Sequence, residues 1–233
     1  MVRRAFMLGI VGLVLAIGSS ANAVTIDDFN AGQVGSFMST STSDPISMTQ
    51  LGLPVANVIG GVRYRNLDQT AGPLNTFASS AVTTAGPQTF LTWANDDGVE
   101  SILTVVYGNT ADLNADLSAD NAFYFIAKTD AVTHAMDITM SVLVGGTTYT
   151  SPPLSIATND TYTNVNIPFA SFGAPGWSDV DKITLTLSSN DPSTDGAIDL
   201  FSTTDPGVPE PFTMGLLGMG LAGLGGYIRR RRA

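Results

Sequence analysis

The sequence contains no cysteine and only one histidine, His134, in 233 residues. Without cysteine the chain can form no disulfide, no thiol nucleophile and no cysteine-ligated metal site. His134 shares its alternating phase with Met136 and Ile138, so we interpret it as a packed side chain. The chain also has no nucleophile-elbow pattern, and its many carboxylates single out no catalytic pair. The sequence therefore predicts no catalytic residue.

Basic residues are scarce between the two ends of the chain. Residues 24–208 contain four, Arg63, Arg65, Lys128 and Lys182, against 19 aspartates and glutamates, which gives this body a net charge of −15. Such a body repels the phosphates of nucleic acids and the surface of anionic lipid. We therefore predict no nucleic-acid partner.

The N-terminus has the three parts of a secretory signal peptide. Arg3 and Arg4 are followed by an apolar run over residues 5–17 and then by Ala21-Asn22-Ala23, a small-x-small cleavage pattern. The apolar run is short for a membrane span. We predict that residues 1–23 are removed after Ala23 by signal peptidase, with an uncleaved anchor as the alternative.

The C-terminus has an uncharged stretch, Phe212–Ile228, of 17 residues, which is the lower limit for a transmembrane helix. A stop-transfer cluster follows at once, made of Arg229, Arg230, Arg231 and Arg232. Adjacent arginines stay on the cytoplasmic side, so the body between the two ends is predicted to lie outside the inner membrane. A G-x-G-x-x-G pattern at Gly218–Gly223 lies inside this stretch without a preceding strand, so it predicts no dinucleotide site.

The residues before this stretch are Val208, Pro209, Glu210 and Pro211. Together with the apolar segment and the arginines they resemble the PEP-CTERM protein-sorting signal, over residues 208–233. The one departure is Phe212, where the family usually has serine or threonine. The resemblance implies a Gram-negative bacterium, a transient stay in the inner membrane, cleavage by an exosortase, and release to the cell surface or the extracellular space. A permanent anchor is the alternative.

The body has the pattern of a β-sheet protein. Apolar and polar residues alternate along many short segments, and Gly, Pro, Asn and Asp separate them. We predict an all-β sandwich over residues 24–202 and a linker over 203–207. The strand candidates are residues 24–29, 61–67, 77–84, 89–94, 100–107, 122–129, 135–144, 147–150, 165–169, 183–187 and 197–202. Trp93 lies in one of these strands and is predicted to be a core residue. Asp97-Gly98 and Gly145-Gly146 predict tight hairpins, and Pro168 predicts an edge strand or its end.

Short segments of the body resemble the galactose-binding-like jelly roll of carbohydrate-binding modules. These segments are Ile26–Phe29, Val165–Phe169, Val180–Leu185 and Ile198–Leu200. The resemblance implies a jelly-roll-like sandwich, in which structural Ca²⁺ is held where the first and last strands meet. It makes Asp28 and Asp199 candidate metal ligands; the alternative is two solvated carboxylates. A second acidic run, Asp112–Asp120, lacks the glycine and glutamate of an EF-hand loop.

Trp177 lies in a Gly/Pro loop beside Asp179, and this pair is the candidate carbohydrate-binding site. The alternative is an indole that anchors the loop on the sandwich. We predict a non-catalytic structural or glycan-associated role in exopolysaccharide or biofilm, with no certain cofactor. The alternatives are a calcium-dependent lectin-like module, a secreted glycan hydrolase and an ice-binding protein. Ice binding needs a regular threonine array, which Thr147, Thr148 and Thr150 alone do not make.

Overall fold

The computed structural model of the protein describes residues 23–203, except residues 33, 41, 43, 86–87, 131–134, 158–160 and 174. Residues 1–22 of the predicted signal peptide, including Ala21, therefore lie outside the described residues, whereas Ala23 is described. His134, most of the linker and the sorting segment also lie outside them. In the part of the chain that is described, no helix is long and apolar enough to cross a membrane.

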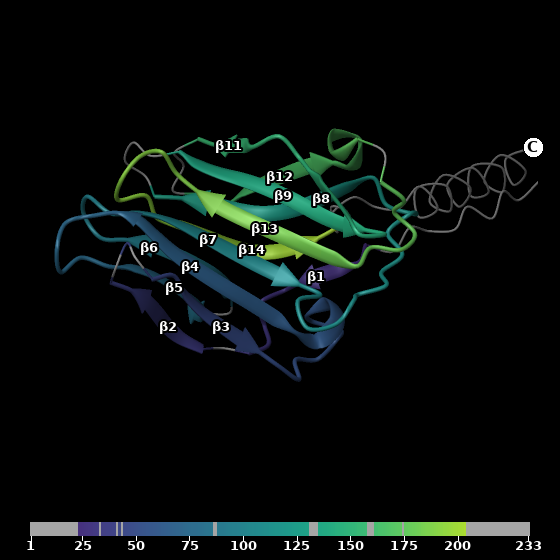
Figure 1. Ribbon diagram of the computed structural model, residues 1–233, viewed down its shortest axis with the longest axis horizontal. Coiled ribbons are helices and arrows are strands. Elements are labelled where there is room, and N and C mark those ends of the chain that lie inside the picture. The colour runs from purple at the N-terminus through teal and green to yellow at the C-terminus, as the bar shows by residue number, and fades with distance from the viewer. Residues whose placement is uncertain are drawn as a thin grey trace, which may run out of the picture. The chain divides into compact units, whose positions relative to one another are not determined.

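The first sheet, sheet A, is antiparallel, and its strands follow the order β12-β8-β14-β6-β5-β2, with β1 paired to β14 (Figure 1). Its strands are β1 (Thr25–Asp27), β2 (Val34–Ser39), β5 (Ala78–Ala85), β6 (Gln88–Asn95), β8 (Ala122–Thr129), β12 (Thr163–Pro168) and β14 (Gly196–Ser202).

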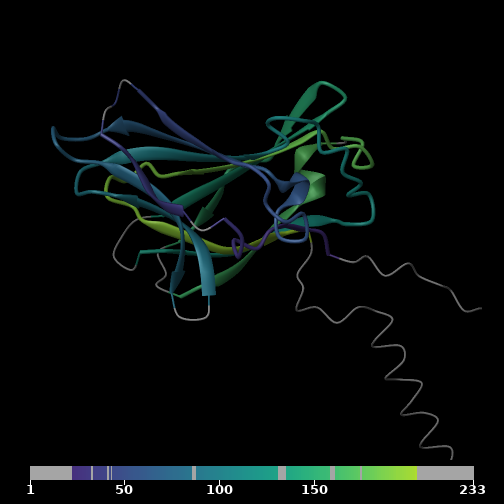
Figure 2. The same ribbon diagram turned by 90° about the horizontal axis from the view of Figure 1, so that it is seen from below.

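The second sheet, sheet B, is also antiparallel, in the order β10-β9-β13-β7-β4-β3, with β11 paired to β9. Its strands are β3 (Ile46–Gln50), β4 (Arg63–Ala71), β7 (Glu100–Tyr107), β9 (Met136–Val144), β10 (Thr147–Thr150), β11 (Leu154–Ile156) and β13 (Lys182–Ser188). Two 3₁₀ helices, η1 (Ile59–Gly61) and η2 (Phe169–Phe172), lie in the connections. The side view in Figure 2 shows the two layers of the sandwich.

The core lies between the two sheets and is built from the inward phase of each strand. Alternation is clearest in β13, where Ile183, Leu185 and Leu187 are buried while the residues between them are half-buried. Trp93, predicted to be a core residue, is 1% exposed. The predicted all-β, jelly-roll-like sandwich is confirmed.

Two of the three turn and edge predictions are confirmed. Gly145-Gly146 joins the paired strands β9 and β10, and both glycines have positive φ angles, 55° and 79°. Strand β12 is at the edge of sheet A and ends at Pro168. The prediction of a hairpin at Asp97-Gly98 is wrong, because β6 belongs to sheet A and β7 to sheet B. Most consecutive strands of this fold change sheet, so a turn sequence alone does not identify the pairing partner.

The two ends of the described chain are hydrogen-bonded to each other. The amide of Val24 donates to the hydroxyl of Thr203 at 2.8 Å, and the amide of Thr203 donates to the carbonyl of Val24 at 3.0 Å. These bonds continue the pairing of β1 with β14. The first and last strands of the sandwich therefore lie side by side.

Candidate functional site

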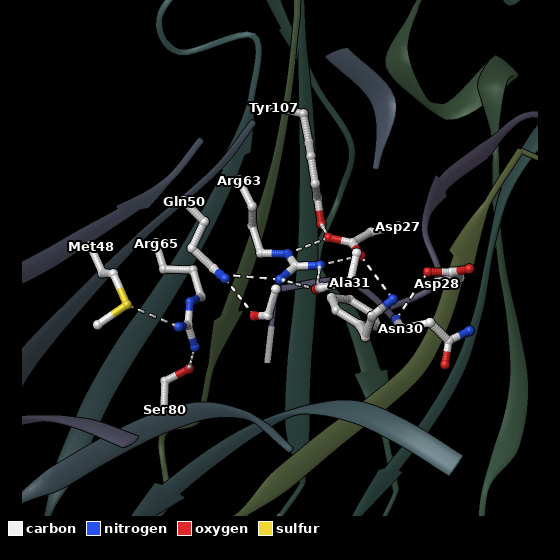
Figure 3. A network of polar contacts seen from close by, with 12 residues as sticks. Asp27, Asp28, Asn30, Ala31, Met48, Gln50, Arg63, Arg65, Ser80 and Tyr107 are labelled. Atoms are coloured by element: carbon white, nitrogen blue, oxygen red, sulfur yellow. Dashed lines mark hydrogen bonds and ion pairs between the residues drawn. The ribbon is translucent and has the colours of Figure 1, made fainter. Parts of the chain in front are cut away.

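A buried ion pair joins the two sheets. Asp27 of β1 and Arg63 of β4 are both 0% exposed, and the guanidinium donates from Nε and Nη2 to the two carboxylate oxygens at 2.5 Å (Figure 3). The Tyr107 hydroxyl donates to the same carboxylate at 2.9 Å, and the amide of Phe29 donates to it at 2.8 Å. Every oxygen of Asp27 is thus satisfied by charged or polar donors, as a buried carboxylate requires.

The rest of the Arg63 guanidinium is also satisfied. It donates to the carbonyl of Ala31 at 3.3 Å and to the side-chain oxygen of Gln50 at 3.1 Å, and it lies over the ring of Phe29. Burial opposes its charge, but the hydrogen bonds and charge of Asp27 outweigh burial, so the pKa of Arg63 is raised. Burial raises the pKa of Asp27, while Arg63 lowers it. With no group left over for a ligand, this network holds the sheets together.

Arg65, two residues further along β4, is a different case. It is also 0% exposed, yet its partners are neutral: Ser80 Oγ at 3.3 Å, Met48 Sδ at 3.3 Å and the ring of Phe37. Among the described residues, its Nε has no hydrogen-bond partner. Burial and the nearby charge of Arg63 lower the pKa of Arg65 to about 10. Among the described residues, the core therefore contains two buried guanidinium groups, Arg63 and Arg65, and one buried carboxylate, Asp27.

Trp177 lies half-buried against the core. Its ring stacks on Phe169 with centroids 3.8 Å apart and contacts Phe123 and Phe172 edge-on. One face of the indole is therefore covered by Phe169 and is closed to a sugar. Asp179 is exposed beside it, and its backbone amide lies 3.5 Å from the carbonyl of Gly176.

The candidate calcium ligands Asp28 and Asp199 have separate partners. Asp28 accepts from the Asn57 amide group at 2.6 Å, whereas Asp199 accepts from the Gln88 amide group at 3.3 Å. In the described part of the chain, no group of three or more His, Asp or Glu side chains is placed to hold a metal ion. The calcium site stays a prediction.

The outer face of sheet A has an aromatic pair that sequence reasoning missed. The rings of Phe90 on β6 and Tyr162, just before β12, are 6.3 Å apart, and the Lys128 ammonium lies 5.3 Å from the Tyr162 ring. Burial raises the pKa of the Tyr162 phenol, and the charge of nearby Asp199 raises it further. We call Phe90, Tyr162, Lys128 and Asp199 the sheet A patch.

The outer face of sheet B is different, because it is rich in hydroxyl groups. The paired register aligns two cross-strand rows there: Ser47–Asn66–Thr104–Thr186–Thr139, and Thr49–Tyr64–Val106–Thr184–Ser141–Thr150. No charged side chain belongs to either row, although the body carries 19 acidic residues. Neighbours in a row are separated by the strand spacing of about 4.8 Å.

Comparisons with known proteins identify the C-terminal segment. Residues 207–232 match the family model of the PEP-CTERM protein-sorting motif. The resemblance stated for Val208–Pro211 and Arg229–Arg232 is thereby confirmed. The motif marks an exported protein that is sorted at the membrane by an exosortase. No curated protein sequence matches the chain.

Among solved structures, the sandwich is similar to carbohydrate-binding modules. The family 11 module of cellulase Lic26A-Cel5E of Clostridium thermocellum has 16% identity and a TM-score of 0.40, with 79% of this chain and 95% of that chain covered. The non-crystalline cellulose specific module CBM28 has 12% identity and a TM-score of 0.40, with 52% and 78% covered. The enzymatically active domain of bacteriophage CBA120 tailspike protein 4 has 10% identity and a TM-score of 0.38, with 59% and 19% covered. None of these likenesses assigns a ligand to this chain.

Proposed function

We propose that this exported protein is a non-catalytic, glycan-associated component of the cell surface or extracellular matrix, and that the sheet A patch contacts the glycan. After export it is released by exosortase into material that contains exopolysaccharide. The proposal concerns binding alone.

The observation that supports this function is the aromatic pair with charged groups beside it. Aromatic faces pack against the C–H faces of sugar rings, and a carboxylate and an ammonium group bind the hydroxyls. Phe90 and Tyr162 supply the rings, while Asp199 and Lys128 lie next to them. Phe90 occupies the outward phase of β6, opposite to Leu91 and therefore away from the core.

Affinity gel electrophoresis of the mature protein tests this proposal. The gels contain a soluble β-glucan, a galactan, a mannan, a xylan or the exopolysaccharide of the producing bacterium. We expect at least one of them to retard the wild-type protein. Phe90→Ala and Tyr162→Ala should each weaken binding about tenfold, because an aromatic contact contributes about 1.4 kcal/mol.

Two further variants separate binding from folding. Tyr64→Ala removes a half-buried tyrosine from the outer face of sheet B and should leave retardation unchanged. Asp199→Asn keeps the size of the side chain and should weaken binding without loss of the fold. A wild-type protein that migrates alike in all five gels contradicts the proposed function.

Ice binding is the second candidate, and the hydroxyl rows of sheet B favour it. The rows give a regular, uncharged array that Thr147, Thr148 and Thr150 alone did not predict. The twist of a sandwich sheet, about 20–25° per strand, works against the flatness that an ice plane requires, so we place this function second.

An ice-growth assay separates the two candidates. An ice-binding protein would shape ice crystals and depress the freezing point, and Thr186→Lys would abolish both effects. Thr92→Lys, on the outer face of sheet A, is the matched control. Unshaped ice in the presence of the wild-type protein excludes this candidate.

A further inference from the structure

A groove with a volume of about 390 Å³ lies between the free edges of the two sheets. One side is β11 of sheet B, and the other is β12 of sheet A. Four of the described lining residues are apolar and four are polar. The apolar ones are Leu154, Ile156, Ala157 and Val165, and the polar ones are Ser155, Thr163, Asn164 and Asn166. None of the described residues that line the groove is charged, so none of them selects a charged ligand.

The groove presents amide groups that the fold does not use. Asn166 is exposed, and its side chain has no hydrogen-bond partner among the described residues. The Asn164 carbonyl oxygen accepts from the Tyr124 hydroxyl at 2.9 Å, which fixes the orientation of that amide and leaves its NH₂ group for a ligand. An amide both donates and accepts hydrogen bonds, which suits it to a sugar hydroxyl.

Prolines near β11 and β12 make it unfavourable for the groove to bind a peptide as an added β-strand. Strand β12 ends at Pro168, and Pro152 and Pro153 immediately precede β11. Proline removes a backbone donor and is one of the residues that protect sheet edges from pairing with another chain. A ligand of this groove is therefore held mainly by side chains and not by a backbone ladder.

The groove lies next to the sheet A patch along β12. Asn164 and Asn166, which line the groove, are on the outward phase of this strand, opposite to buried Val165. Tyr162 precedes Asn164 by two residues and therefore shares that phase. A volume of about 390 Å³ falls in the range of sites that hold small-molecule ligands, about 300–1,000 Å³. We propose that the groove binds additional sugar units of an extended, uncharged glycan whose neighbouring unit contacts Phe90 and Tyr162. This inference rests on the proposed function.

The dependence of affinity on oligosaccharide length tests whether the groove binds additional sugar units. Isothermal titration calorimetry on the mature protein would compare the disaccharides and hexasaccharides of β-glucan, galactan, mannan and xylan. In Asn166→Ala the dissociation constant of the bound hexasaccharide should rise about fivefold, as expected for one neutral hydrogen bond. The disaccharide should bind as it does to the wild type. Asn66→Ala, the same change on the outer face of sheet B, is the matched control and should affect neither.

The outcomes distinguish this inference from the proposed function. If Phe90→Ala weakens binding but Asn166→Ala leaves the hexasaccharide affinity unchanged, the patch is a binding site and the groove is not. If Asn166→Ala raises the dissociation constants of the disaccharide and the hexasaccharide equally, the groove inference is also overturned. If the wild-type protein binds none of these sugars, the proposed function and the groove inference are both wrong.

Discussion

Replacing Arg65 by methionine should stabilise the protein. The guanidinium is fully buried without a carboxylate, and the pKa lowered from 12.5 to about 10 corresponds to about 3 kcal/mol against the charged form. The substitution loses the contact with Phe37 and the bond to Ser80 Oγ, which together offset about 1–2 kcal/mol. Methionine is unbranched and flexible enough to fill the same space. We expect a net gain of about 1–2 kcal/mol in the free energy of unfolding.

Urea denaturation at pH 7 measures this gain. The midpoint should rise while the slope with denaturant stays constant, because the area exposed on unfolding hardly changes. The double variant Arg65→Met, Ser80→Ala removes the hydroxyl that loses its partner and should be at least as stable. A destabilisation of about 1 kcal/mol or more in Arg65→Met would refute the reasoning, because it would mean that the buried cation is compensated by an interaction other than Ser80, Met48 and Phe37.

Three further predictions concern charged side chains of the sandwich. Arg63→Met, the matched change in the same strand, should cost about 3–5 kcal/mol in urea denaturation because it leaves Asp27 buried and unpaired; a cost below about 1 kcal/mol contradicts this. Burial raises the pKa values of Asp195 and Asp199, so both bind a proton more tightly when folded. The stabilisation that this proton binding adds to the free energy of unfolding is fully present below about pH 4 and is lost as pH rises through the folded pKa values. The melting temperature should therefore increase as pH falls from 7 towards about 4. A steady decrease of the melting temperature over this range would contradict the prediction. Calcium held by Asp28 and Asp199 should raise the melting temperature at millimolar concentration, and an unchanged value removes that site.

Much of the fold could be predicted from the sequence, because burial of one face imposes a period of two on each strand. The strands over residues 100–107, 122–129 and 147–150 have the predicted bounds. Strands β2, β3 and β11 were missed. Strand β3 is an edge strand with both phases largely exposed, and β11 has three residues, so neither shows a clear alternation. The sequence also could not predict to which sheet each strand belongs. The strands on either side of Asp97-Gly98, β6 and β7, show a similar alternation but belong to different sheets.

The candidate site was harder to predict, because a binding surface breaks the pattern that reveals the fold. Trp177 was chosen as a candidate carbohydrate-binding residue because it is an aromatic residue in a loop. In the structure its ring stacks on Phe169. Phe90 could have been noticed in the sequence. It is an aromatic residue on the polar phase of a strand whose other phase contains Leu91 and Trp93. Folding does not need an aromatic side chain there, since Thr92 occupies the next position of that phase. Tyr162 had no such signal, because its partner across sheet A is 72 residues away in sequence. We therefore base the proposed binding surface on Phe90 and its charged neighbours and not on Trp177, because a loop aromatic also serves to anchor the loop to the core.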